Sequence, residues 1–140
     1  MGRIMAIDYG QKRVGLAVTD ENRIIATPLT TVSAHECINY LKDYVLNNVV
    51  DIFVVGLPKQ MNNKDSDSVK YINPFIKQLK KNFPEIKIER WDERFTSKMA
   101  FQTMIDSGIG KQKRQNKALV DTISATIILQ SYLESLTYNR

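Results

Sequence analysis

The sequence predicts an α/β fold in which a mixed five-stranded sheet carries helices on both faces. Short apolar runs that stop near glycine or proline predict strands, and longer stretches with apolar residues every three or four positions predict helices. Their order is β-β-β-α-β-α-β-α-α, and strands joined through helices are expected to pair in parallel. At 140 residues, the chain is expected to form one domain over residues 1–140.

The first three strands are expected to form a meander. Residues 4–7 are continuously apolar, as expected of a strand that is covered on both faces. Residues 14–19 follow after so short a connection that the pair is predicted to be an antiparallel hairpin, with Gly10 in the turn. A weaker third strand is predicted over residues 24–27 and is expected to end at Pro28.

A helix and a central strand follow the meander. Residues 33–36 have the spacing of a helix capping box, Ser-x-x-Glu, so a helix is expected from there to about residues 47–48. The run at residues 51–55 is apolar after its first residue, and glycine and proline follow it closely. This pattern predicts a strand in the middle of the sheet.

The second half of the chain is expected to alternate between helices and one more strand. A helical pattern from Val69 to Leu79 contains Pro74, which either kinks one helix or opens a new helix with Asn73 as its cap. The later expectations are a strand at 86–91, a helix from Thr96 or Ser97 to about Ser107, a basic loop at 108–116 and a long helix from Lys117 to about Leu136.

The composition excludes several classes of site. Cys37 and His35 are the only cysteine and histidine, so neither an internal disulfide nor a Cys/His zinc site can form. On a helix, these two side chains would diverge, and Cys37 is expected to be buried. No apolar run approaches the ~20 residues that span a bilayer, and no signal peptide is recognisable, so we expect a cytoplasmic protein without a membrane partner.

Acidic residues follow two predicted strands. Asp8 ends the first strand, where an isolated aspartate is about equally often a turn former. Asp92 and Glu93 follow the strand at 86–91, where the alternatives are a helix cap or an ion pair with Arg94. Because consecutive strand residues point to opposite faces, only one of this pair is expected to face the side of Asp8.

Asp121 is the third acid, and it lies on the last predicted helix. The residues 4, 7 and 11 positions later are Ala125, Ile128 and Tyr132, so Asp121 heads an apolar stripe that is expected to face the sheet. A carboxylate there loses hydration, which either an ion pair with Lys117 or a bound cation would offset. Three such acids predict a site for Mg²⁺ or Mn²⁺.

Cations accompany each acid, and the net charge of +5 favours an anionic partner. Two ions about 4 Å apart would activate water and stabilise the leaving oxygen of a phosphodiester, so the pattern predicts a nuclease. A solvated connector is the alternative reading of the basic loop. The cations expected to contact phosphate are Lys12, Arg13, Arg94, Lys111, Lys113, Arg114 and Lys117.

Two other phosphate-binding classes are less consistent with the chain. The glycines at 10 and 15 superficially resemble a phosphate loop, but Leu16 and Ala17 stand where Lys-Ser/Thr is required, and a strand follows instead of a helix. An ATP-binding module of the actin and sugar-kinase type also begins with a similar hairpin. Such proteins enclose the nucleotide between two domains, which a single domain of this size cannot do.

Four motifs in register resemble the YqgF (RuvX) family over essentially the whole chain. They are DYGQKRVGLA at 8–17, VGLP at 55–58, DERFTS at 92–97, and Asp121 with ILQSYL at 128–133. The resemblance implies a ribonuclease H-like fold related to the RuvC resolvases. It also implies a cytoplasmic nuclease that matures the 5′ end of 16S ribosomal RNA, an older reading being resolution of Holliday junctions.

The resemblance also assigns roles to residues. It implies that Asp8, Glu93 and Asp121 are the catalytic, metal-binding acids, with Asp92 as the alternative to Glu93. RuvC-type enzymes carry a further acid about one helical turn before the last-helix aspartate, and Ala118 stands there instead. The family often has glycine where Asn63 follows Asn62, a small departure because asparagine tolerates the same left-handed backbone.

Three functions therefore remain open. The leading one is a metal-dependent endonuclease acting on structured RNA, with a ribosome precursor as its partner. The second is cleavage of branched DNA, and the third is an RNA-binding module that keeps the fold without the activity. Either a monomer or a homodimer is consistent with the sequence.

Overall fold

The computed structural model describes residues 2–10, 12–57, 67–92 and 117–138, which include a five-stranded sheet in the order β3-β2-β1-β4-β5. β1, β2 and β3 form an antiparallel meander, and β4 and β5 pair in parallel with β1 and with each other. The strands are β1 Arg3–Tyr9, β2 Arg13–Thr19, β3 Ala26–Ser33, β4 Val50–Leu57 and β5 Lys87–Asp92.

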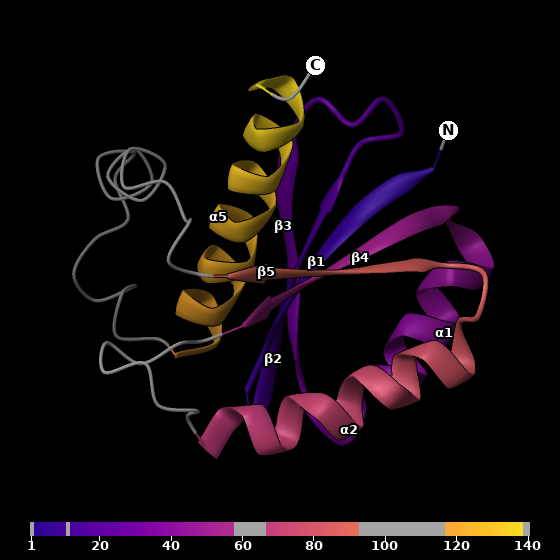
Figure 1. Ribbon diagram of the computed structural model, residues 1–140, viewed down its shortest axis with the longest axis vertical. Coiled ribbons are helices and arrows are strands. Elements are labelled where there is room, and N and C mark those ends of the chain that lie inside the picture. The colour runs from indigo at the N-terminus through magenta and orange to yellow at the C-terminus, as the bar shows by residue number, and fades with distance from the viewer. Residues whose placement is uncertain (1, 11, 58–66, 93–116, 139–140) are drawn as a thin grey trace.

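Helices cover both faces of this sheet, as the sequence predicts (Figure 1). α1 (Cys37–Asn47) and α2 (Asp67–Asn82) pack on one face, and α5 (Lys117–Tyr138) packs on the other. The helix expected at 96–107 lies outside the described residues. Within the described part of the chain, no helix combines the length and the apolarity needed to cross a membrane.

β1 separates two hydrophobic cores because its side chains alternate between the faces of the sheet. Met5 and Ile7 pack on the α1/α2 face, whereas Ile4 and Ala6 pack on the α5 face. All four are completely buried, and burying an isoleucine contributes about 1.5–3 kcal/mol to folding. The apolar run at the start of the chain is therefore a strand covered on both faces, as predicted.

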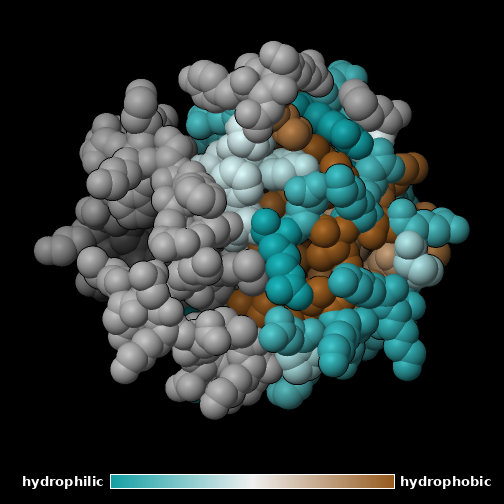
Figure 2. Space-filling view, viewed as in Figure 1, coloured by the Kyte–Doolittle hydropathy of each residue, from teal (hydrophilic) through white to brown (hydrophobic). Residues whose placement is uncertain are grey.

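Apolar side chains come to the surface near β5, the strand at the other edge from β3. Figure 2 shows them at the centre of the face on which β5 lies, with polar side chains around them. On the α5 side of β5, the ring of Trp91 meets Tyr132 edge to face at a centroid distance of 5.8 Å. This aromatic pair closes the α5 core against the β5 edge.

The third strand corrects the prediction that Pro28 ends it. β3 runs from Ala26 to Ser33, and Pro28 is paired with Ala17 of β2. The register shifts between Leu16 and Ala17 at this point. An edge strand tolerates a proline because only one of its sides forms the ladder, and irregular pairing is one place where proline occurs in sheets.

The capping box is a second correction. Ser33 is the last residue of β3 and pairs with Arg13, so it cannot cap the helix. The residue at the N-cap of α1 is Glu36, whose side chain makes no capping hydrogen bond, and its backbone N–H donates to the Ser33 carbonyl instead (3.1 Å). At Ser33, pairing within the sheet therefore takes precedence over the local pattern for a helix cap.

Pro74 lies inside α2, which is one continuous helix from Asp67 to Asn82. Of the two readings left open by the sequence, the single helix is the one observed. Phe75, Ile76 and Leu79 directly after the proline are buried in the core. Their burial compensates for the backbone hydrogen bond that a proline cannot donate.

A charged network fixes the start of β1, at the end of the sheet far from Asp8. The carboxylate of Asp51 accepts hydrogen bonds from the Gly2 N–H (2.8 Å) and from Arg23 Nη2 (2.7 Å), and Arg23 Nε donates to the Gly2 carbonyl (2.9 Å). A Cβ on Gly2 would lie 2.5 Å from Asp51 Oδ1, so a larger residue there would displace the Asp51 carboxylate from these hydrogen bonds. Arg23 adopts a left-handed backbone, with φ 57°, to reach this position.

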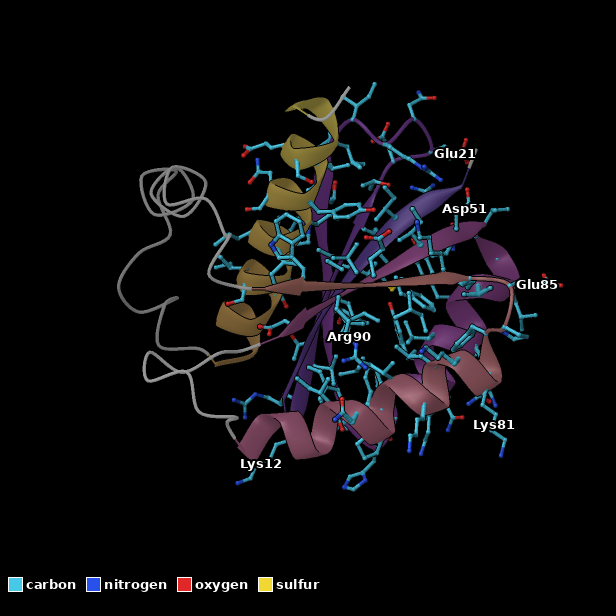
Figure 3. All side chains as sticks on the ribbon, in the orientation of Figure 1. Lys12, Glu21, Asp51, Lys81, Glu85 and Arg90 are labelled. Carbon is cyan, nitrogen blue, oxygen red and sulfur yellow. The ribbon has the colours of Figure 1, made fainter. Side chains whose placement is uncertain are left out.

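Asp51→Ala is expected to lower the free energy of unfolding by about 1 kcal/mol, because it removes two charge-assisted bonds from a half-exposed site. Urea denaturation measures the change. Glu21→Ala is the matched control, since Glu21 is exposed and only approaches Arg3 at 3.8 Å (Figure 3). Equal effects of the two substitutions would contradict the network.

Cys37 is completely buried at the start of α1, as expected from the sequence, and burial raises the pKa of its thiol to about 12. Only the thiolate reacts with a disulfide reagent, so the folded protein should resist such a reagent at pH 8. After unfolding in urea, the one thiol of the chain should react rapidly. Fast reaction of the folded protein at pH 8 would show that the thiol is accessible.

Candidate active site

Asp8 is the residue around which the candidate site is built. It is the second-last residue of β1 and is half-buried. In the sheet register it lies between Gly15 of β2 and Gly56 of β4. Residues directly opposite one another share a face of the sheet, so the two residues paired with Asp8, both glycines, contribute no side chain to that face.

The Asp8 carboxylate belongs to the α5 face of the sheet. Ile4 and Ala6 pack in the core beneath α5, and the side chain two residues further along a strand returns to the same face. Tyr9 instead packs with the core beneath α1 and α2. The end of β1 thus presents an acid to one layer and an aromatic ring to the other.

Residues that are paired across neighbouring strands form a row that crosses the sheet. The first turns of α5 lie over the row that contains Asp8. Thr31 of β3 pairs with Gly15 in this row, and its hydroxyl is hydrogen-bonded to the hydroxyl of Thr122. The buried hydroxyl of Thr126 is satisfied in the same part of the helix, because its Oγ1 donates to the Thr122 carbonyl (2.8 Å). The backbone at position 121, immediately before Thr122, is therefore held at the Asp8 end of the sheet.

The stripe predicted to follow Asp121 faces the sheet. Ala125, Ile128 and Tyr132 are buried, with exposed fractions of 0%, 2% and 5%. They pack against the α5 side of β1 and β4. The helix is thus oriented as the sequence predicts, although the side chain of Asp121 itself lies outside the described atoms.

The end of β5 reaches the same edge of the sheet. Trp91 pairs with Gly56, and Asp92 pairs with Leu57. Because β1, β4 and β5 are parallel, their carboxyl ends meet at one edge, with Asp92 one residue beyond the Asp8 row. Glu93, the preferred candidate of the pair, lies outside the described residues.

The hairpin after Asp8 carries the first two predicted phosphate contacts. The Gly10 N–H donates to the Arg13 carbonyl (3.0 Å), and a Cβ at position 10 would lie 2.7 Å from that oxygen, so glycine closes the turn. Lys12 is exposed and Arg13 is half-buried. Lys117 is described only by its place at the start of α5, and Arg94, Lys111, Lys113 and Arg114 lie outside the described residues.

The structure brings together residues that the sequence does not single out as parts of a site. In the sequence, Gly15 belongs to the predicted second strand and Gly56 to a strand end, and Thr31 and Thr122 carry no motif of their own. Their shared row depends on the pairing register, for which no sequence pattern codes directly. Among the described side chains, no three potential metal ligands lie together, since the proposed set extends beyond them.

The fold is ribonuclease H-like, and two solved resolvases share it. T. thermophilus RuvC in complex with a Holliday junction substrate matches with a TM-score of 0.59 at 10% identity, covering 96% of each chain. The Fowlpox virus resolvase bound to Holliday junction DNA matches with a TM-score of 0.53 at 17% identity, covering 94% of this chain and 99% of that one. At these identities, the likeness concerns the fold alone.

The chain belongs to the RuvX family, whose description is Holliday junction resolvase and whose sequence model matches residues 2–135. A Bacteroides thetaiotaomicron protein is 57% identical over 135 residues, covering 96% of this chain and 98% of its own length. A Flavobacterium psychrophilum protein is 59% identical over 133 residues, covering 95% and 97%. Both are named "Putative pre-16S rRNA nuclease".

Thr31→Val is expected to destabilise the protein by about 1 kcal/mol, because it removes a hydrogen-bond partner of the buried Thr122 without changing the size of the side chain. Thr31→Ser keeps the hydroxyl and should retain most of the stability. The control is Thr27→Val, at an exposed threonine of the same strand. If Thr31→Val were as stable as Thr27→Val in urea, the Thr31–Thr122 bond would not hold α5 to the sheet.

Proposed function

We propose that the protein is a metal-dependent endonuclease that hydrolyses phosphodiester bonds in structured nucleic acid and processes the 5′ end of pre-16S rRNA. The observation that carries the proposal is the row Thr31–Gly15–Asp8–Gly56, which lies beneath the first turns of α5. It sets a carboxylate between two glycines at the edge where Asp92 and position 121 also lie. The names of the close relatives favour pre-16S rRNA as the substrate.

The proposed metal ligands are Asp8, Glu93 and Asp121. Carboxylate oxygens are the ligands that Mg²⁺ and Mn²⁺ prefer, and the glycines beside Asp8 leave space that larger side chains would fill. Two such ions would supply a hydroxide nucleophile at neutral pH and stabilise the leaving oxygen. The chain's own part is to hold the acids on three separate elements.

The pairing of β5 supports Glu93 over Asp92 as the third ligand. Trp91 contacts Tyr132 of α5, so position 91 faces the same layer as Asp8. Side chains return to the same face every second residue along a strand, and two residues beyond Trp91 is Glu93. Asp92, the last residue of β5, remains the alternative.

The predicted cations are proposed to bind backbone phosphates around this edge. Lys12 and Arg13 are in the hairpin that leaves Asp8, and Arg94 follows Glu93. The others, Lys111, Lys113, Arg114 and Lys117, precede Asp121 along the chain. Contacts of this kind position a nucleic acid without reading its sequence, so the substrate would be recognised by its structure. We propose that the protein acts as a monomer or homodimer in the cytoplasm.

Cleavage of a four-way DNA junction is the second candidate function. The description of the family as Holliday junction resolvases favours it. A pre-16S rRNA leader and a synthetic four-way junction, each incubated with Mg²⁺ or Mn²⁺, would separate the two. Faster cleavage of the junction under identical conditions would replace the rRNA proposal, whereas salt-dependent RNA binding with neither substrate cut would favour a non-catalytic module.

Asp8→Asn is expected to slow cleavage of the pre-16S rRNA leader by on the order of 10²–10³, because it removes a metal-binding charge while keeping the side chain's size. Single-turnover rates in Mn²⁺ measure the loss. Asp43→Asn, at an exposed position of α1, makes the same chemical change away from the site and should cleave normally. Cleavage by Asp8→Asn at the normal rate would refute the assignment.

A further inference from the structure

A groove of about 560 Å³ lies between α1 and α2, on the opposite face of the sheet from α5. The residues that define its chemistry are Tyr9, His35, Asn39, Lys42, Gln78 and Asn82. Tyr9 stacks on Phe75 of α2 with a centroid distance of 4.2 Å and an angle of 20° between the rings. The α1 face, the α2 face and the end of β1 thus enclose one polar hollow with an aromatic wall.

The lining of the groove suits an anionic ligand that also has hydrogen-bond donors and acceptors. Among the described residues that line it none is acidic, whereas Lys42 and His35 are present. The amides of Asn39, Gln78 and Asn82 offer both donors and acceptors. Asn82 is held in place because its Nδ2 donates to the Gln78 carbonyl (2.8 Å), which leaves the amide oxygen as an acceptor.

The hairpin that follows β1 meets the groove at Ala34. The backbone N–H of Ala34, a lining residue, donates to the Lys12 carbonyl (3.0 Å), so the backbone of the hairpin after β1 adjoins the groove. The volume falls within the range of sites for a single small molecule, too small for a duplex.

The location connects this groove to the Asp8 row. Asp8 and Tyr9 are consecutive residues at the end of β1, and their side chains face opposite layers. A polynucleotide with one phosphate at Asp8 therefore needs only to pass over the edge of the sheet to reach Tyr9. The groove and the candidate active site are two sides of the same strand end.

We propose that the groove binds a nucleotide of single-stranded RNA that flanks the scissile phosphate. Its phosphate lies near Lys42, and its base edge meets the amides beside the ring of Tyr9, the way in which proteins read unpaired bases. This assignment rests on the proposed nuclease function, because it assumes that the RNA bound at Asp8 continues into the groove. It gives the enzyme a requirement for an unpaired nucleotide next to the cut.

Binding without cleavage tests the groove separately from the chemistry. In an Asp8→Asn background, the affinity for a fluorescent single-stranded RNA of about ten nucleotides is measured by anisotropy at several salt concentrations. Lys42→Gln is compared with Lys80→Gln, the same change at an exposed α2 residue that does not line the groove. A duplex RNA of equal length is the second probe.

Lys42→Gln should weaken binding of the single strand by about fivefold and reduce the slope of log affinity against log salt by about 0.7, the value for one lost phosphate contact. Lys80→Gln should leave both unchanged, and duplex binding should be the same for all variants. Asn39→Ala with Gln78→Ala should weaken single-strand binding without changing the salt slope, since no charge is lost.

Equal affinities of Lys42→Gln and Lys80→Gln for the single strand would overturn the proposal. So would an equal loss of duplex binding, or a change in sedimentation of the Lys42→Gln protein, which would assign the groove to a second copy of the chain. Failure of the nuclease proposal has a different signature, normal cleavage by Asp8→Asn, and does not affect this binding measurement.

Discussion

The alternation of side chains along β1 is the constraint on which the rest of the structure depends. β1 is the central strand and is covered on both faces, so a shift by one residue would exchange every side chain between two different cores. The register is fixed at its start by Asp51, which binds the Gly2 N–H, and by Thr19, whose hydroxyl accepts a hydrogen bond from the Ile4 N–H (2.9 Å). These bonds, far from Asp8, determine which layer Asp8 faces.

That alternation also explains why the end of one strand places a polar side chain on each face of the sheet. Asp8 faces α5 with a glycine on each side, whereas Tyr9 faces the groove between α1 and α2. The two glycines carry no side chain that could fill the space beside this half-buried carboxylate. The arrangement is consistent with a site that is completed by a ligand.

The sequence predicts those features that depend on local periodicity. The hairpin, the buried β1 and the stripe Ala125–Ile128–Tyr132 follow from apolar spacing and a turn glycine, and all three are observed. The capping box at Ser33 and the strand end at Pro28 were wrong because pairing with β2 outweighs local preference. The Thr31–Gly15–Asp8–Gly56 row and the α1/α2 groove bring together distant segments, so only the register reveals them. The single-domain organisation over 1–140 stays a prediction.

The proposed ligand set gives Asp8 a larger share of the metal binding than the acids on the other elements. RuvC-type enzymes have an acid one helical turn before the last-helix aspartate, whereas this chain has Ala118 there, so α5 would bring one carboxylate to the site instead of two. If Glu93 and Asp121, on separate elements, each held one ion, Asp8 in the middle of the row would be the carboxylate that contributes to both. The glycines at 15 and 56 leave access to it from both sides, which a ligand shared between two ions requires.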